Sequence, residues 1–432
     1  MTSAYGARPA EAFEYEEWRD SGPRPSPLVA LAVMLLLATS SFVSVEPALC
    51  DLLFPPVLAL VLVSGHMASP LRLPGVFLAS MIVFVLANYA SLISAWAWNL
   101  GESWFFLGIT LYMLAYFVFF AGFLGKFGRR GAEIMRDGYL LAAVVTATIG
   151  VLAAFQILPN SEAYFRDAAL TRIKSTFKDP NVFGPFLVGA IFLGISALVH
   201  AERMKLRYLI VIALSLIGVT LSFSRGAWVH LAVSLVVYLA LELIFVRAPI
   251  ARRRLVRGLA FVSPLLVAGI FVLLVTTDLG SYLVGRLSFQ SYDAERFGNQ
   301  QFALELADRN LFGIGPGQYM VPRFSLDIHN LYLRVLLENG VVGLLALLTL
   351  LGASVFYGLA GVLRRGPQVG MYTASVAVIM GILVESLVID TLHWRHFFFF
   401  LSIPVGLTIY EQANSAESID EAGALPPQGV AP

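Results

Sequence analysis

The most regular feature of the chain is the alternation of long apolar runs with short polar breaks. Each run is close to the length of about 20 residues that an α-helix needs to cross the hydrocarbon core of a bilayer. This pattern predicts an all-α integral membrane protein with about 12 transmembrane helices. The predicted spans are residues 27–45, 50–68, 74–96, 103–125, 139–158, 181–200, 208–223, 226–246, 259–277, 340–362, 371–389 and 397–410.

Composition agrees with a multi-pass membrane protein. Hydrophobic residues make up 58% of the 432 residues and charged residues only 13%, against about 25% charged residues in soluble domains. The single cysteine, Cys50, excludes an intramolecular disulfide and a cysteine-based zinc cluster. A formal net charge of +1 gives no indication of a nucleic-acid partner.

The distribution of lysine and arginine predicts the orientation of the chain. The polar, acidic segment 1–26 and the apolar run after it have no pattern of a cleavable signal peptide, so the first helix is expected to stay as an anchor, and we place the N-terminus in the cytoplasm. The short loops rich in Lys and Arg then fall on the cytoplasmic side, as the positive-inside rule requires. A membrane domain over 27–410 is followed by 411–432, which we expect to be a disordered cytoplasmic tail.

Two long outer loops, 159–180 and 278–339, are positively charged against that rule, and the second is predicted to contain an amphipathic helix near 293–308. Their cations either pair with local acids and lipid head groups or converge on an anionic ligand, since guanidinium groups match phosphate oxygens. Arg225, in "LSFSRGAWVHL", favours the second interpretation, because no acid lies within fifteen residues of it. The cations of the two loops are Arg166, Arg172, Lys174 and Lys178, and Arg286, Arg296, Arg309, Arg323 and Arg334.

The segment "SLDIHNLYLRVLLENGVVGLL" places ionisable side chains directly before an apolar run. If Asp327 caps a helix, then Asn330, Arg334 and Glu338 share one stripe and His329 lies about 100° away. The spacing predicts a structural ion pair between Arg334 and Glu338. His329 is a candidate proton acceptor at the outer boundary, with a purely structural boundary histidine as the alternative.

Other motifs are weaker. No histidine pair has the spacing of a metal site such as H-E-x-x-H, so we expect neither a metal nor another cofactor. The sequence "GIGPG", Gly313 to Gly317, lacks the strand-turn-helix context of a dinucleotide site and predicts a tight backbone turn.

Three elements in order carry a resemblance to a known family. They are "SFSRGAW" around Arg225, "ERFGNQQFALELADRNLFGIGPGQY" around Arg296, and "HNLYLRVLLENGVVG" from His329. Together with "TFKDPNVFGPFL", they resemble the O-antigen ligase and O-antigen polymerase superfamily of bacterial inner membranes. The resemblance covers roughly residues 140–362 directly.

The resemblance implies an enzyme that works at the periplasmic face of the inner membrane without a metal. Such enzymes move a glycan from a polyprenyl diphosphate, typically undecaprenyl diphosphate, to an acceptor hydroxyl. The acceptor is the lipid A core in ligases and another lipid-linked repeat in polymerases. Both remain open, as do an exopolysaccharide or capsule product and contacts with other polysaccharide-assembly proteins.

The resemblance also implies roles for individual residues. His329 is the expected general base for the acceptor hydroxyl. Arg225 and Arg296 are expected to bind the diphosphate, with Arg172 and Lys174 as further candidates. We expect Arg225, Arg296 and His329 to converge on one outward-opening cavity.

A second group of residues is expected to support the site. Asn330 would orient His329 or a sugar hydroxyl, and Glu338 would fix the helix through Arg334. Gly340 and Gly343 are expected to allow close packing of helices.

Two other classes of protein stay open at this stage. A secondary transporter or lipid flippase usually shows internal repeats and ionisable residues near the bilayer midplane. No repeat is apparent here, and Glu242 and Glu385 are the main ionisable candidates. A non-catalytic partner of a polysaccharide export machine would need neither His329 nor Arg225.

Overall fold

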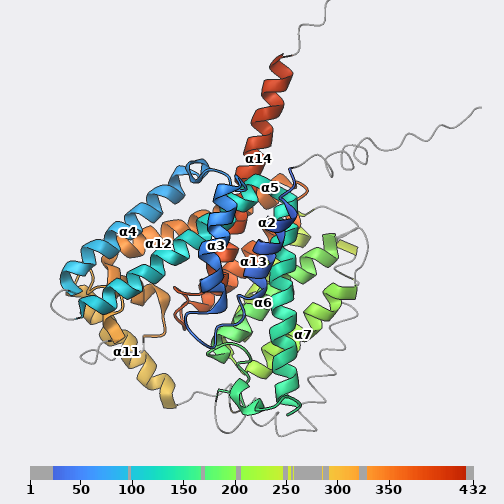
Figure 1. The fold of residues 1–432 in the computed structure, drawn as a ribbon. Coiled ribbons are helices and arrows are strands. Elements are labelled where there is room, and N and C mark those ends of the chain that lie inside the picture. The colour runs from blue at the N-terminus through green and yellow to red at the C-terminus, as the bar shows by residue number, and fades with distance from the viewer. Residues whose placement is uncertain are drawn as a thin grey trace, which may run out of the picture.

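The computed structural model describes residues 23–95, 99–166, 171–200, 206–246, 291–320 and 328–424, together with 252, 253, 256 and 285. The secondary structure of these residues is helical, apart from one bridge pairing between Phe165 and Ile173. Most helices gather into one bundle, and α14 extends from it toward the C-terminus (Figure 1).

The helices follow the apolar runs of the sequence. They are α2 (Pro27–Ala38), α3 (Leu49–Val63), η1 (Pro70–Arg72), α4 (Gly75–Ala95), α5 (Leu100–Ala154), η2 (Ser161–Tyr164), α6 (Pro180–His200), α7 (Leu206–Ser222), α8 (Arg225–Ala240), the π-turn η3 (Leu241–Phe245), α11 (Ser291–Asp308), η4 (Gln318–Met320), α12 (Leu331–Arg364), α13 (Val369–Glu385) and α14 (Arg395–Ala424).

Five helical stretches in the described part of the chain are long and apolar enough to cross a membrane. They are Gly75–Ala95, Leu100–Ala154, Pro180–His200, Arg225–Phe245 and Leu331–Arg364. Four shorter apolar helices accompany them. These findings agree with an integral α-helical membrane protein, while the count of twelve spans stays a prediction. The expected span 259–277 lies outside the described residues.

The predicted spans 103–125 and 139–158 fall on the two halves of α5, which are separate helices that meet at a kink at Gly128, where φ is 48°. The basic segment between them is helical rather than a loop. Likewise α14 continues past residue 410, so the part of the expected disordered tail up to Ala424 is helical. Its sequence "EQANSAESIDEA" is rich in the helix formers Glu, Gln and Ala.

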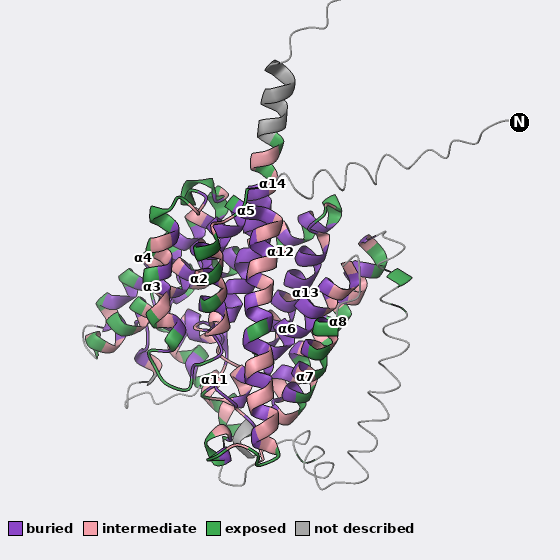
Figure 2. Cartoon of the chain, turned by 45° about the vertical axis from the view of Figure 1, so that its right-hand side comes forward, coloured by how far each residue is buried: buried purple, intermediate pink, exposed green. Residues whose placement is uncertain are grey.

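The interior is built around aromatic side chains. Tyr139 of α5 stacks on Phe186 of α6, with ring centroids 4.5 Å apart, and on Phe399 of α14, at 5.1 Å. The α6 helix is largely buried, whereas α4 and α8 expose apolar side chains such as Ile93 and Val236 outward (Figure 2). Exposed apolar surface of this extent is expected of a protein that faces lipid.

The predicted amphipathic helix near 293–308 corresponds to α11, Ser291–Asp308. A small apolar cluster connects it to the start of α12. Its members are Ala303, Ala307, Ile314, Ile328 and Leu337. The outer loop is thereby packed onto the element that carries His329.

Candidate active site at the start of α12

The start of α12 is fixed by Asn330. Its Oδ1 accepts from the Leu333 N–H at 3.0 Å, which is an N-cap, and its Nδ2 donates to the Leu387 carbonyl at 2.9 Å. The cap that we expected at Asp327 is therefore at Asn330, and Asp327 itself lies outside the described residues. This amide has two structural partners and holds the backbone next to His329.

His329 precedes the cap and adopts a left-handed backbone conformation, with φ of 45°. Few residues other than glycine adopt this conformation, and such positions concentrate at functional sites. The half-buried His329 side chain borders a pocket of about 170 Å³. The pocket is lined by Tyr319, Ile328, His329, Arg334, Ile389 and Asp390.

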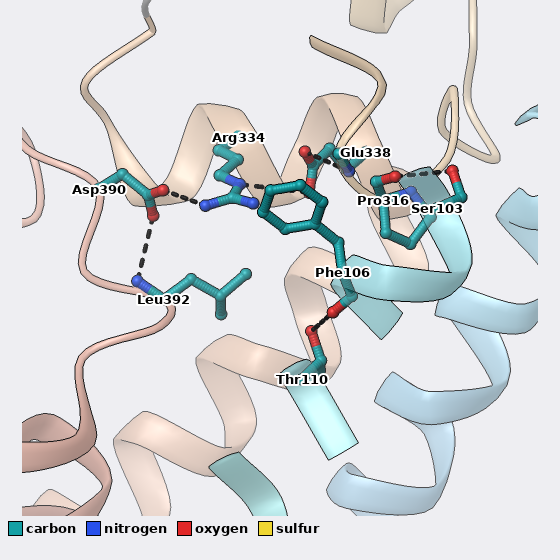
Figure 3. A network of polar contacts seen from close by, with 9 residues as sticks. Ser103, Phe106, Thr110, Pro316, Arg334, Glu338, Asp390 and Leu392 are labelled. Atoms are coloured by element: carbon teal, nitrogen blue, oxygen red, sulfur yellow. Dashed lines mark hydrogen bonds and ion pairs between the residues drawn. The ribbon is translucent and has the colours of Figure 1, made fainter. Parts of the chain in front are cut away.

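Arg334 forms the charged wall of this pocket. Its Nε lies 3.3 Å from Glu338 Oε2, and its Nη1 donates to Asp390 (Figure 3). The guanidinium also lies between two rings, 5.2 Å from the centroid of Phe106 and 4.8 Å from that of Tyr319. The predicted ion pair of Arg334 with Glu338 is present, and it is one part of a larger buried network.

Asp390 is the site residue that sequence reasoning missed. It lies in the turn between α13 and α14, 56 residues after Arg334, and it lines the same pocket as His329. Burial would raise the pKa of Asp390, but the Arg334 guanidinium lowers it below the ordinary value for an aspartate. Burial, reinforced by Arg334, lowers the pKa of the neighbouring His393 to about 3. The pocket therefore contains a carboxylate close to the candidate base.

The "GIGPG" turn is held against a break in α12. At Gly340 the backbone leaves the helical region, with φ of 71° and ψ of −174°. The freed carbonyls of Leu337 and Glu338 accept from the N–H groups of Ile314 at 2.9 Å and Gly315 at 3.0 Å. In addition, Glu338 Oε1 accepts from the Gly317 N–H at 2.8 Å. Glu338 thus joins the turn to Arg334.

Two glycines make this close approach possible. A Cβ atom on Gly313 would lie 2.3 Å from the Glu338 carbonyl oxygen, and one on Gly340 would lie 2.2 Å from that of Leu311. Gly340 therefore serves to break α12 and admit the loop, rather than to pack two helices as we expected. Gly343 does face α4, since its Cβ would lie 3.5 Å from Ala87.

A second polar group ties the turn to α5. Gln318 Nε2 donates to the Asn99 carbonyl at 2.7 Å and to Ser103 Oγ at 2.8 Å. Ser103 Oγ in turn donates to the Pro316 carbonyl at 2.6 Å (Figure 3). The beginnings of α5 and α12 are thereby joined through one loop.

The first outer loop meets the turn that carries Arg225. Arg172 Nη2 donates to Asn181 Oδ1 at 2.9 Å, and its Nε donates to the carbonyl of Ser222 at 3.3 Å. Arg225 begins α8 directly after the N-cap Ser224. Arg172 thus lies next to the turn that holds Arg225, while Lys174 is placed by its N–H, which donates to the Tyr164 carbonyl at 2.9 Å.

Several other outer cations pair with acids. Arg166 lies 3.4 Å from Asp179, and Arg395 Nε donates to Asp51 at 2.7 Å. For Arg166 the simpler of our two interpretations, pairing with a local acid, is confirmed.

We expected Arg225, Arg296 and His329 to converge on one cavity, and the structure tests only part of this prediction. His329 lines the pocket, whereas Arg225 and Arg296 are not among the described side chains that do so. Arg296 is placed on α11, which packs against α12. Convergence of the two arginines with His329 stays a prediction. Among the described residues, no group of three His, Cys, Asp or Glu side chains is arranged to hold a metal ion.

A comparison of the chain with models of protein families shows which family this region resembles. Residues 210–348 match the family model described as O-antigen ligase. The matched segment belongs to the O-antigen ligase superfamily. It runs from α7 through Arg225, Arg296 and His329 past the break at Gly340, so it includes most of the candidate site but not Asp390. No curated protein matches the chain.

The match of this segment to the O-antigen ligase model supports a glycan-transferring activity of the ligase or polymerase type. Together with the apolar helices, it indicates a bacterial membrane protein.

Proposed function

We propose that the protein transfers a glycan from a polyprenyl diphosphate, such as undecaprenyl diphosphate, to an acceptor hydroxyl at the periplasmic face of the inner membrane. The observation that carries this proposal is the placement of His329, a residue of the O-antigen ligase segment in a left-handed backbone conformation, on a pocket with Arg334 and Asp390. The pocket is smaller than the about 300–1,000 Å³ of sites for drug-sized ligands. It therefore suits the reacting end of a substrate rather than a whole glycan.

The proposed reaction is a displacement at the anomeric carbon. The acceptor oxygen attacks this carbon, the bond from the carbon to the diphosphate oxygen breaks, and the hydroxyl proton passes to His329. Charge that develops on the leaving diphosphate would be stabilised by Arg225 and Arg296, with Arg172 and Lys174 nearby as additional cations. No metal or other cofactor takes part in this scheme.

His329 receives its position from structural neighbours. Asn330 caps α12 and bonds to the α13–α14 turn, so it fixes the residue before it. Arg334, through Glu338 and Asp390, holds the wall opposite the histidine. These contacts support a role for Asn330 and Glu338 in positioning rather than in proton transfer.

The test is a transfer assay with the purified full-length chain and a polyprenyl-diphosphate-linked glycan. We expect His329→Ala to lower kcat by about 10² to 10⁴, the usual contribution of a general base. The matched control is His66→Ala, since His66 lies outside the O-antigen ligase segment and bonds to the N–H of Ser26. Full transfer by folded His329→Ala protein would overturn the proposed role.

The acceptor distinguishes a ligase from a polymerase. We favour a ligase with a lipid A core or similar acceptor, and a polymerase of O-antigen or exopolysaccharide repeats is the alternative. A deletion strain that accumulates polyprenyl-linked polymer and bare core indicates a ligase, whereas capped single-repeat lipopolysaccharide indicates a polymerase. Loss of secreted or capsular polysaccharide alone would assign the protein to that pathway.

A further inference from the structure

One face of α8 carries a continuous stripe of buried polar groups. Every fourth residue from Gly226 belongs to it, so successive members are neighbours one turn apart and the stripe winds gradually round the helix. It begins at the half-buried Gly226, continues through His230, Ser234 and Tyr238 of α8, and ends at Glu242 in the adjoining η3. His230, Ser234 and Tyr238 are 0% exposed and Glu242 is 3% exposed. The α8 helix lies at the edge of the bundle and packs on its inner side against α13 and α6 (Figure 2).

At the Arg225 end of α8, the stripe is completed by Glu385 of α13. His230 Nδ1 lies 3.1 Å from Glu385 Oε2, and both side chains are fully buried. Glu385 also lies against the first turn of α8, since a Cβ on Gly226 would be 2.6 Å from its Oε1. The half-buried Gly226 thus connects this pair to the end of the helix.

In the middle of the helix, Gly381 of α13 provides the space for two polar side chains. A Cβ at that position would lie 2.2 Å from the His230 ring and 2.3 Å from Ser234 Oγ. These two groups are therefore neighbours. One turn further on, the Tyr238 hydroxyl lies close to Glu242 and to Ser196 of α6.

At the opposite end, Glu242 pairs with His200 of α6. The distance from His200 Nε2 to Glu242 Oε1 is 2.8 Å, and the His200 side chain is 22% exposed. Gly370 makes room for His200 and Ser196, because its Cβ would lie within 2.7 Å of both side chains. The stripe therefore opens at this end of the bundle.

The stripe covers most of a bilayer. At about 1.5 Å per residue, the axis from Gly226 to Glu242 is about 24 Å long, compared with about 30 Å of hydrocarbon. Apart from the 3.1 Å contact between His230 and Glu385, the His230 ring nitrogens, Ser234 Oγ, the Tyr238 hydroxyl and the Glu385 oxygens have no hydrogen-bond partner among the described residues. Burying such groups is costly, and apolar side chains of similar volume would stabilise the bundle more. Intramembrane Glu and His chains of this kind mark proton relays.

We propose that this stripe conducts protons across the membrane, between His200 with Glu242 at one end and His230 with Glu385 at the other. At each step one N–H or O–H bond breaks and one forms on the neighbouring group, through Tyr238 and Ser234, and nothing is oxidised or reduced. His396 of α14 is a further titratable group near His230. This activity is separate from glycan transfer and does not depend on His329.

The test is proton flux into vesicles that contain the purified full-length chain. A pH-sensitive dye is enclosed in the vesicles, and a potassium gradient with valinomycin sets the membrane potential. We expect wild-type vesicles to change internal pH several times faster than protein-free vesicles. Glu385→Gln and Glu242→Gln, at opposite ends of the stripe, are each expected to reduce the rate to that of protein-free vesicles. Ser354→Ala, which alters a buried serine of α12 outside the stripe, should keep the wild-type rate.

Wild-type flux equal to that of protein-free vesicles would overturn the proposal, as would unchanged flux in both glutamate variants. A second measurement guards against variants that fail to fold: infrared titration of the wild-type protein, followed at the band of protonated carboxylic acids. A band that changes with pH and is missing in Glu385→Gln supports the relay, and a wild-type band without pH dependence contradicts it. Normal glycan transfer by the glutamate variants would show that the two activities are independent.

Discussion

At the residue scale, the contact with the largest expected effect on stability joins Arg334 to two acids. Glu338 and Arg334 are 2% and 3% exposed, so removing the cation leaves carboxylates in a poorly solvated place. We expect Arg334→Ala to lower the free energy of unfolding by about 3–5 kcal/mol, as for other broken buried pairs. The measurement is thermal unfolding of the purified protein in detergent.

The control for this prediction is Arg129→Ala. Arg129 pairs with Glu133 at 3.1 Å, but the two side chains are 28% and 45% exposed, and exposed pairs on one helix contribute only about 0.3–0.5 kcal/mol. Equal unfolding temperatures for the two variants would show that the Arg334 network does not hold the site together.

The contrast between Glu338 and Asp390 shows how far the site could be predicted from the sequence. The Arg334–Glu338 pair depends only on helical spacing, so it could be predicted. The Asp390 contact depends on how the α13–α14 turn folds back toward α12, which no local pattern encodes. The same limit applies to the cap: Asp327 and Asn330 are both good capping residues, and the bond of Asn330 to Leu387 favours the later start.

At the element scale, the break in α12 gives a sharp prediction. Gly340→Ala would place a side chain at positive φ and against the Leu311 carbonyl. We expect the free energy of unfolding to fall by more than about 1–3 kcal/mol, since the backbone strain alone accounts for that amount. We also expect glycan transfer to be reduced. Unfolding temperature and transfer rate are the two readouts.

Gly352→Ala in the same helix is the matched control. Among the described residues, no heavy atom other than those of its chain neighbours and of the helix's own backbone lies within 4 Å of a Cβ built there, and the backbone is helical. Alanine in a helix interior is favoured over glycine by about 0.5–1 kcal/mol, so this variant should be at least as stable as wild type. If Gly340→Ala behaves like Gly352→Ala, the break is not required.

Hydropathy predicted the bounds of some helices well and those of others poorly. The bounds of α4, α6 and α13 lie within a few residues of the predicted apolar runs, because these helices are apolar along their length. The helical conformation of the residues on either side of the Gly128 kink in α5 was not predicted, because that segment is charged. A hydropathy window assigns a charged segment to a loop, although Lys, Arg and Glu are good helix formers. The same reason applies to the helical residues after 410.

At the scale of the whole molecule, the distribution of charge predicts two distinct faces. Arg309 follows α11 in the outer loop, and Gln412 lies in α14 beyond the last apolar run; both are exposed. In a Cys50→Ala background, we expect Arg309→Cys to react with a membrane-impermeant maleimide in intact spheroplasts. Gln412→Cys should react only after the membrane is opened.

The unsubstituted chain provides the control, because its one cysteine, Cys50, is buried and should not be labelled. Labelling of both positions from the same side would contradict the predicted orientation, and labelling of Arg309→Cys only after the membrane is opened would place the His329 pocket on the cytoplasmic face.

The interlocked turn at Gly340 has a consequence for how this enzyme can be rebuilt. The loop from Leu311 to Gly317 and the start of α12 exchange main-chain hydrogen bonds in both directions, so neither half keeps its shape without the other. A chimera between two superfamily members that joins the parental sequences between these segments would bring together surfaces never selected to fit. The smallest segment to graft intact therefore extends from α11 to just past the break. We expect a chimera that receives this whole segment to acquire the acceptor preference of the donor protein.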